Sequence, residues 1–209
     1  MKNLLYILVC LSMVSMASAL SITNGNFESQ SGTADAADVS RWYDYGNSNF
    51  NAGPWFRGSG EGTINSTGCL FMSGSAADSS VDGGHKAYVY QSIGDADGTQ
   101  AIDISLQWGA AGAGEDIGSG HGGVMGLTVM ILESDGSFIP GEWARINDIY
   151  GAGGITEITR ATIVRDLEPG IAVNEVFTLD ISGATVGNEL FIRINAYDAV
   201  VDPWVSIDN

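Results

Sequence analysis

The sequence predicts an all-β protein, a two-sheet antiparallel β-sandwich. Apolar and polar residues alternate with a period of two in several short segments, as they do in strands that bury one face. Glycine accounts for 29 of the 209 residues, against an average share of about 7%. It gathers with Asp, Asn and Ser between those segments, where tight turns require such residues. No segment shows a sustained helical stripe with capping residues.

The clearest strand is Ile102–Trp108, in which every apolar residue falls on one face. Phe177–Ile181 and Leu190–Asn195 alternate in the same way, with Phe191 as the one exception, so half-buried strands are expected there. Val124–Leu132 is a nearly continuous apolar run, which predicts a strand covered on both faces; its period alone also fits a buried helix. The other expected strands are Leu20–Thr23, Arg41–Tyr45, Cys69–Met72, Lys86–Ile93, Thr156–Arg165 and Trp204–Ile207.

Turn residues separate these strands at Gly94–Gly98, at Glu168–Gly170 and at Val186–Asn188. The stretch Phe27–Gly84 is rich in Ser, Gly, Asn and Asp and gives weak strand signals. A structureless loop of that length would be unusual, so we expect short strands that the pattern does not place. The sequence shows no internal repeat and no linker, which predicts a single β-sandwich domain over residues 20–209.

Residues 1–19 are typical of a cleaved secretory signal peptide. Lys2 precedes the apolar run Leu4–Val14, and Ala17-Ser18-Ala19 places small residues at both recognition positions. The run is shorter than the roughly 20 residues that span a bilayer. We therefore expect cleavage after Ala19, a secreted or cell-surface location and no membrane insertion of the mature chain. Val205–Asn209 has the pattern of a strand cut off in the middle, which predicts a longer reading frame.

The chain is strongly acidic, with 25 acidic and 8 basic residues and a net charge of −17. Such a surface repels nucleic-acid phosphates and anionic lipid, which makes both poor partners. It favours hard cations such as calcium, although simple solubility explains most of these acids equally well. Beyond the signal peptide only Cys69 remains, so the core or a metal must hold the domain without an intrachain disulfide.

Two short segments carry a resemblance to a known family. Ile22-Thr23-Asn24-Gly25-Asn26-Phe27-Glu28 stands near the mature start, and Trp204-Val205-Ser206-Ile207-Asp208-Asn209 stands at the end. The pairing resembles galactose-binding-like jelly-roll modules of bacteria, in particular the CenC-like group of carbohydrate-binding modules. It is also similar to exported proteins that carry a Pro-Glu-Pro type C-terminal sorting tail, which this sequence lacks. The resemblance implies a two-sheet jelly roll whose first and last strands lie close together.

The same resemblance implies a structural calcium ion near the first segment. Carried over to this sequence, Glu28 and Asp208 would supply carboxylates, and backbone carbonyls near Asn24 or Asn26 would add to the shell. Calcium takes about six to eight oxygens, so these groups form only part of a site. The alternative is an ordinary turn and a polar strand end.

Six aromatic residues fall within a short segment. Trp42 is expected in the core, while the others, Tyr43, Tyr45, Phe50, Trp55 and Phe56, lie among Asn, Gly and Asp. Exposed rings beside amides and carboxylates suit sugars, which stack their C–H faces and hydrogen-bond through their hydroxyls. We expect Trp55, with Tyr45 or Phe56 beside it, to form a stacking platform. Asp44, Asn49 and Asn51 are the expected hydrogen-bonding groups; the alternative is that the rings cover the sandwich edge.

Other strings carry no function. Gly118–Gly123 fits a nucleotide-binding string, but a β run follows it instead of a helix. His85 and His121 have no partners at zinc spacing, and Asp95–Gly98 reads as a hairpin turn. Glu133–Asp135 begins a glycosidase string, but Phe138 stands where its final Glu belongs.

The sequence thus favours an exported, non-catalytic carbohydrate-binding module. The second interpretation is a structural or cell-surface matrix protein without a small ligand. The third is a glycan-degrading hydrolase, which no catalytic string supports: the sequence has no nucleophile elbow, and no carboxylate pair stands out among its acids.

Overall fold

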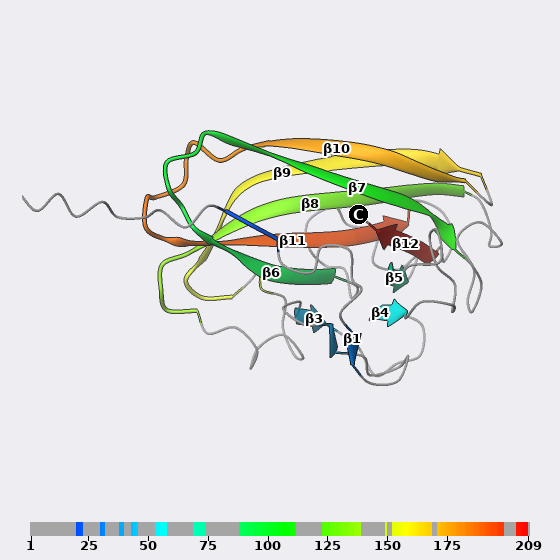
Figure 1. Ribbon diagram of the computed structural model, residues 1–209, viewed down its shortest axis with the longest axis horizontal. Helices are drawn as coiled ribbons and strands as arrows, with labels where there is room; N and C mark the ends of the chain where they lie inside the picture. The colour runs from blue at the N-terminus through cyan, green and yellow to red at the C-terminus, as the bar shows by residue number, and fades with distance from the viewer. Residues whose placement is uncertain are drawn as a thin grey trace, which may run out of the picture.

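Two five-stranded antiparallel sheets lie face to face in the computed structural model (Figure 1). It describes residues 20–22, 30–31, 38–39, 43–45, 53–57, 69–73, 88–111, 123–138, 149, 152–168, 171–198 and 204–208. The strands are β1 (Gln30–Ser31), β2 (Asp38–Val39), β3 (Tyr43–Tyr45), β4 (Gly53–Arg57), β5 (Cys69–Ser73), β6 (Tyr88–Asp95), β7 (Ala101–Ala111), β8 (Gly123–Ser134), β9 (Ile155–Leu167), β10 (Ala172–Asp180), β11 (Glu189–Asp198) and β12 (Trp204–Asp208).

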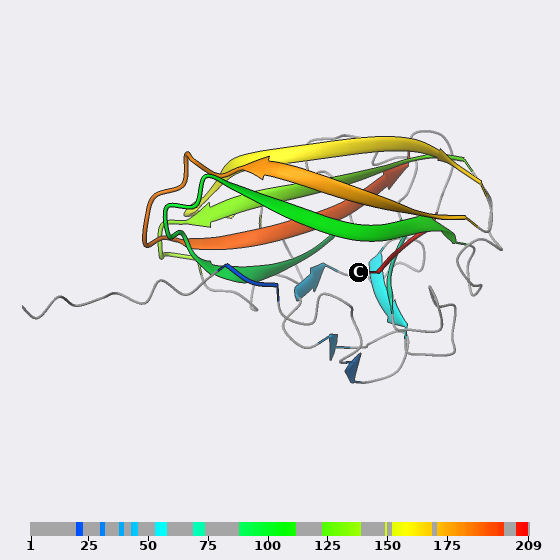
Figure 2. The ribbon, with the colours of Figure 1, turned by 45° about the horizontal axis from the view of Figure 1, so that its top comes forward.

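One sheet has the order β3-β6-β11-β8-β9 and is called here the β11 sheet; the other has the order β10-β7-β12-β5-β4 and is called the β7 sheet. β1 and β2 pair only with each other among the described strands. Apart from β8–β9 and β4–β5, neighbouring strands within each sheet are not consecutive in the chain, as jelly-roll connections require. Figure 2 shows the two layers with β7 and β10 crossing over β8 and β11. The chain is a jelly-roll β-sandwich: the alternation predicts the two-sheet sandwich, and the resemblance implies the jelly roll.

The core lies between the sheets and is built from alternate strand positions. Ile104, Leu106 and Trp108 are buried on β7, while the residues between them face outward. Opposite them, Leu127 and Ile194 are fully or almost fully buried on the β11 sheet. The half-buried patterns expected for Ile102–Trp108 and Phe177–Ile181 are confirmed, and Val124–Leu132 is a strand buried on both faces.

A second apolar cluster covers the outer face of the β11 sheet. Phe138 stacks edge-on against Tyr90 and Phe191, with ring centroids 6.2 and 5.6 Å away, and Ile149 and Ala152 pack beside them. The strand expected at Leu190–Asn195 is confirmed as part of β11, but its expected half-burial is wrong, because β11 is the middle strand and residues 190–195 are all buried. Residues that follow β8 supply the cover that the local pattern does not reveal.

Arg193 is fully buried on this outer face of β11. Its Nη1 donates a hydrogen bond of 2.6 Å to Oδ1 of Asn195, which is also fully buried. The same nitrogen lies 3.7 Å from the sulfur of Met130. A buried cation needs such partners, because an unpaired charge away from water is very costly.

One end of the sandwich is closed by turns in which an aspartate carboxylate accepts a hydrogen bond from the backbone N–H two residues later. Asp97, Asp135 and Asp180 accept hydrogen bonds of 2.9 Å from the backbone N–H of residues 99, 137 and 182. In each turn the side-chain hydroxyl of that residue has the larger effect and its backbone amide the smaller one, and both hydrogen bonds lower the pKa of the aspartate. The expected turns at Gly94–Gly98 and Val186–Asn188 lie at this end. The hairpin expected at Asp95–Gly98 is wrong, because this turn joins β6 of one sheet to β7 of the other.

Several expected strands differ in extent from the observed ones. Leu20–Ile22 follows β6 through a 2.9 Å hydrogen bond from the Ser21 amide to the Ile93 carbonyl but is not a strand, and Thr23 lies outside the described residues. Of the strand expected over Arg41–Tyr45, Tyr43–Tyr45 is observed as β3, while Arg41 and Trp42 lie outside the described residues. β4 falls within Phe27–Gly84, where short strands are expected but not placed by the pattern, and its Pro54 suits the edge position that β4 takes.

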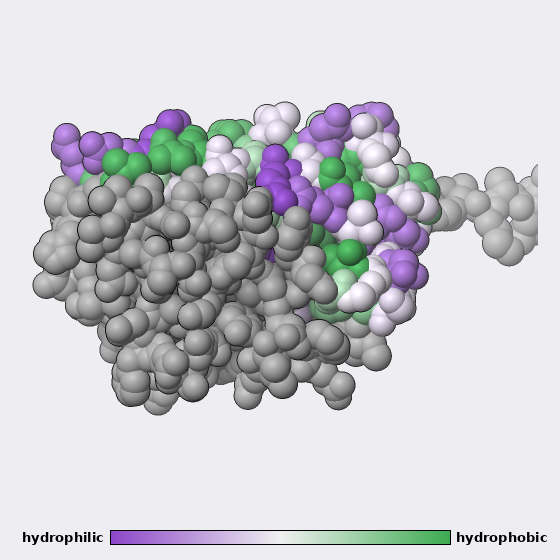
Figure 3. All heavy atoms as spheres, turned by 180° about the vertical axis from the view of Figure 1, so that it is seen from behind, coloured by the Kyte–Doolittle hydropathy of each residue, from purple (hydrophilic) through white to green (hydrophobic). Residues whose placement is uncertain are grey.

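The described surface mixes apolar and polar side chains. On the face turned away in Figure 1, green and purple residues are interspersed (Figure 3). The exposed large aliphatic side chains among the described residues are Val164, Ile171, Val176 and Val186. Within the described part of the chain, no helix is long and apolar enough to cross a membrane.

Candidate functional site

The aromatic segment of the sequence forms the two edge strands on one side of the sandwich. Asp44 and Tyr45 lie on β3, the edge of the β11 sheet, and Trp55 and Phe56 lie on β4, the edge of the β7 sheet. β3 and β4 contact each other across the sandwich edge. Asn49 and Asn51, expected as hydrogen-bonding groups, lie outside the described residues.

The register of β4 separates its two aromatic positions. Phe56 pairs with Leu70, Leu70 with Ile207, and Ile207 with Trp108, which is fully buried in the core. Paired residues of antiparallel strands share a face, so position 56 belongs to the inner face of the β7 sheet. Position 55 belongs to the outer face, because successive residues of a strand alternate between faces.

The register of β3 divides the predicted site further. Asp44 pairs with Val89, a core residue. Tyr45 pairs with Tyr88, which is two residues from Tyr90 of the second apolar cluster and therefore belongs to the outer face of the β11 sheet. Positions 45 and 55 therefore lie on opposite outer faces of the sandwich, and positions 44 and 56 lie on its inner faces. The expected platform of Trp55 with Tyr45 or Phe56 needs correction, because strand geometry does not bring these positions to one face.

The outer face of the β7 sheet collects other aromatic positions around position 55. Trp55 pairs directly with Phe71 on β5. Trp204 on β12 pairs with Ser73, two residues from Phe71 on the same strand. Positions 55, 71 and 204 thus lie on three adjacent strands and one face. Sequence reasoning missed Phe71 and Trp204, although the alternation of their short strands carries the signal.

Polar side chains continue this outer face along β7 and β10. Nε2 of Gln107 donates a 3.2 Å hydrogen bond to Oδ1 of Asn174. Oγ1 of Thr178 donates a 2.7 Å hydrogen bond to Oδ1 of Asp103. Val176, 62% exposed, stands between these pairs. The same face therefore also offers amide, carboxylate and hydroxyl groups on β7 and β10, the strands that follow β12 in the sheet.

Of the predicted metal ligands, only Asp208 lies among the described residues. Asp208 is the last residue of β12 and pairs with Gln107, while Glu28, Asn24 and Asn26 lie outside the described residues. Among the described residues no group of three or more His, Cys, Asp or Glu is placed to hold a metal ion. The calcium prediction therefore stays a prediction.

No protein-family model matches this chain, and no curated protein matches it. Among solved structures, it is similar to an arabinose-bound MgGH51 α-L-arabinofuranosidase, with a TM-score of 0.50 and 16% identity over 92% of this chain and 25% of that chain. It spans only a quarter of that enzyme's length.

The chain is also similar to a structure of CBM4, with a TM-score of 0.47 and 16% identity over 90% of this chain and 96% of that chain. A further match is the N-terminal cellulose-binding domain of β-1,4-glucanase C from Cellulomonas fimi, with a TM-score of 0.43 and 10% identity over 87% of this chain and 91% of that chain. At these identities the comparisons bear on the fold alone, which is a β-sandwich jelly roll.

Proposed function

We propose that this protein is an exported, non-catalytic carbohydrate-binding module that holds a polysaccharide on the outer face of the β7 sheet. The observation that carries the proposal is the set of aromatic positions 55, 71 and 204 on three adjacent strands of that face. Aromatic residues at neighbouring positions of one face suit the C–H faces of successive sugar units, since aromatic surfaces gain most from apolar contact.

Polar groups farther along the same face, on β7 and β10, supply the second half of sugar recognition. Gln107, Asn174, Asp103 and Thr178 offer both donors and acceptors, which a hydroxyl needs because it uses both. Asn49 and Asn51 precede β4 in the chain and remain in the proposal as further amide groups. Pro54 fixes its own φ next to Trp55, which lowers the entropy lost on binding.

A structural calcium ion is part of the proposal. Glu28 and Asp208 would bind it with carboxylates and Asn24 and Asn26 with carbonyl oxygens, the ligands that calcium prefers. It would tie the segment after Leu20–Ile22 to the end of β12. The ion would stabilise the fold and take no direct part in sugar binding.

A glycan array probed with the full protein tests the proposal directly. We expect retention on at least one polysaccharide, and loss of that retention in Trp55→Ala. A protein that binds no polysaccharide, or a Trp55→Ala variant that binds as well as the wild type, contradicts it. The first result favours a surface-matrix protein without a small ligand, and the second moves the sugar site away from position 55.

A further inference from the structure

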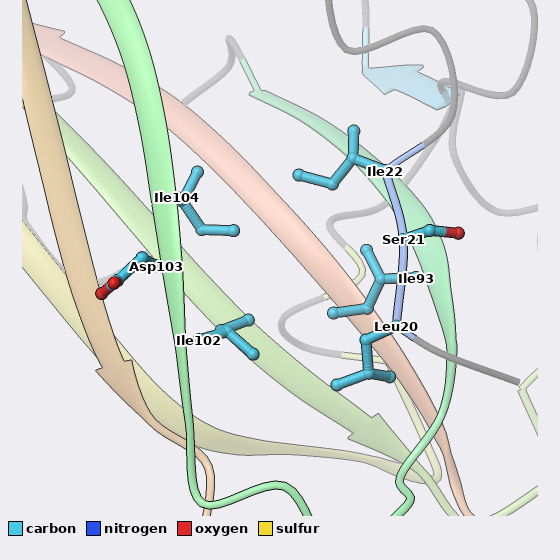
Figure 4. A pocket seen from close by; sticks show the side chains of 7 residues that line it. All are labelled: Leu20, Ser21, Ile22, Ile93, Ile102, Asp103 and Ile104. Carbon is cyan, nitrogen blue, oxygen red and sulfur yellow. The ribbon is translucent and has the colours of Figure 1, made fainter. Parts of the chain in front are cut away.

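A carboxylate is held in place on the outer face of the β7 sheet. Figure 4 shows Asp103 on β7 turned away from the apolar hollow that Ile102 and Ile104 line. Asp103 is exposed, and its Oδ1 accepts a 2.7 Å hydrogen bond from Oγ1 of Thr178 on β10. This hydrogen bond orients the carboxylate on the face that the proposed polysaccharide covers.

The neighbouring rows of β7 and β10 offer the other contacts that a sugar ring uses. Val176, 62% exposed, pairs with Ser105, and the hydrogen-bonded pair Gln107–Asn174 lies in the next row. Each row is two residues from the next, a step of about 6.7 Å along the strand. A substituent on a sugar ring above Val176 therefore comes close to the carboxylate of Asp103.

The cations of the neighbouring strands do not offset the charge of Asp103. Neither β7 nor β10 contains a Lys or Arg. Arg165 on β9, which contacts β10, is held by Glu175 through hydrogen bonds of 2.8 and 3.3 Å. Arg57 shares the outer face by register, but β4 lies three strands from β7. That distance is about 14 Å, which exceeds the Debye length of about 8 Å at physiological salt.

We infer that Asp103 sets the charge specificity of this face, so that it binds a polysaccharide without carboxylate or sulfate groups. The inference rests on the proposed function and adds the class of polysaccharide to it. The carboxylate accepts hydrogen bonds from the hydroxyls of an uncharged sugar, whereas it repels an acidic substituent. The net charge of −17 acts in the same direction.

The position of Asp103 also sets the length of chain that it senses. Trp55 shares a row with Phe71, Ser206 and Gly109, and Asp103 lies further along β7 than Gly109 by about 20 Å. Only a long chain that covers both the aromatic positions and β7 meets the carboxylate. Contacts at the aromatic positions depend on the ring and not on its charge.

The test compares two derivatives of the polysaccharide that retains the protein on the array, one lightly carboxymethylated and one lightly hydroxyethylated. The two substituents are similar in size, and only the first is charged. Titration calorimetry of the full protein should show binding to the hydroxyethyl form that is roughly fivefold tighter or more, as expected for like charges near a protein surface. Added salt should reduce this preference, because it screens exposed charges.

Asp103→Asn is the decisive variant, and Asp166→Asn is its matched control. The new asparagine keeps an oxygen that accepts the hydrogen bond from Thr178, so the protein should fold and bind the hydroxyethyl form like the wild type. Its preference over the carboxymethyl form should fall roughly threefold or more. Asp166 is exposed on β9 in the other sheet, and Asp166→Asn makes the same change in net charge but should keep the preference.

The inference is overturned if the wild type binds both derivatives equally or if Asp103→Asn keeps the full preference. It is also overturned if Asp166→Asn loses the preference to the same extent, because net charge alone would then explain the selection. Trp55→Ala separates this inference from the proposed function: it should weaken binding to both derivatives by the same factor and leave their ratio unchanged. A wild-type protein that binds no polysaccharide contradicts the proposed function itself, and the inference with it.

Discussion

Gly154 illustrates how one backbone position fixes the turn at the start of β9. Its φ is +77°, in the left-handed region, and a Cβ there would overlap Oγ of Ser137 and the carboxylate of Asp135. The Asp135 amide also donates a 2.9 Å hydrogen bond to the Gly154 carbonyl. Only glycine combines a positive φ with the absence of a Cβ that this position requires.

We therefore expect Gly154→Ala to lower the free energy of unfolding by about 1–3 kcal/mol, the usual range for a strained backbone position. Gly153→Ala is the matched control, because a Cβ at Gly153 has nothing within 4 Å. It should change stability by less than about 0.5 kcal/mol. Urea unfolding measures both, and equal effects of the two substitutions would show that this account of the turn is mistaken.

Glu133 links the end of β8 to the turn before β11. Its carboxylate accepts hydrogen bonds of 2.9 Å from the Thr185 amide and 2.6 Å from the Asn188 side chain. Burial alone would raise the pKa of Glu133, but the hydrogen bonds from Thr185 and Asn188 outweigh it and lower the pKa below its ordinary value. The charged form therefore stabilises the folded state.

Glu133→Gln should cost about 1–3 kcal/mol near neutral pH, because the amide cannot accept both hydrogen bonds with the strength of a carboxylate. The folded pKa lies below the unfolded one, so this stabilisation is complete above the unfolded value of about 4.3 and is lost as the pH falls through the folded value. Unfolding from pH 7 to pH 3 should show the difference shrinking below about pH 4. Glu168→Gln, at an exposed position, is the control; a difference that grows on acidification contradicts the assignment.

At the scale of elements, the long strands are predictable from the sequence and their surroundings are not. Ile102–Trp108 alternates because its two faces differ, and the structure keeps that difference. β11 shows an alternation too, yet both of its faces are buried. The cover comes from Phe138, Ile149 and Ala152, whose sequence positions give no indication of where they pack.

The short edge strands escape prediction for another reason. β4 is five residues long and contains Pro54, which an edge strand tolerates and a central strand does not. Across the sheet, position 55 of β4 pairs with position 71, which pairs with position 206, and these positions are far apart in the chain. The local sequence indicates that the site is aromatic. Which face of the sheet each aromatic residue belongs to depends on the register between strands, and only the strand pairing in the structure gives that register.

The second apolar cluster yields a test at this scale. Phe138→Ala should cost about 3–5 kcal/mol, because it removes a buried ring from contact with Tyr90 and Phe191. Val186→Ala, at a position 68% exposed, should change stability by less than about 0.5 kcal/mol. Thermal or urea unfolding distinguishes them, and a neutral Phe138→Ala would show that the cluster is only a loose cover.

At the scale of the whole molecule, the acidic surface and the calcium proposal are linked. If calcium binds only the folded state, stability must rise with its concentration, by about 2.7 kcal/mol at 100 times the dissociation constant. We expect the melting temperature to rise with calcium and fall with a chelator, and Glu28→Gln to reduce this response without unfolding the protein. An identical melting temperature in calcium and in chelator excludes the proposed ion.

The central claim is that the outer face of the β7 sheet binds carbohydrate, and the pair Trp55→Ala and Phe56→Ala tests it most directly. Their positions are successive in β4 but belong to opposite faces. Retention on the best polysaccharide of the array and the free energy of unfolding should be measured for both variants. We expect Trp55→Ala to abolish retention with a stability change below about 0.5 kcal/mol, and Phe56→Ala to lose about 3–5 kcal/mol yet retain polysaccharide while folded. Unimpaired retention by Trp55→Ala, or a core-sized loss of stability in it, would contradict the account.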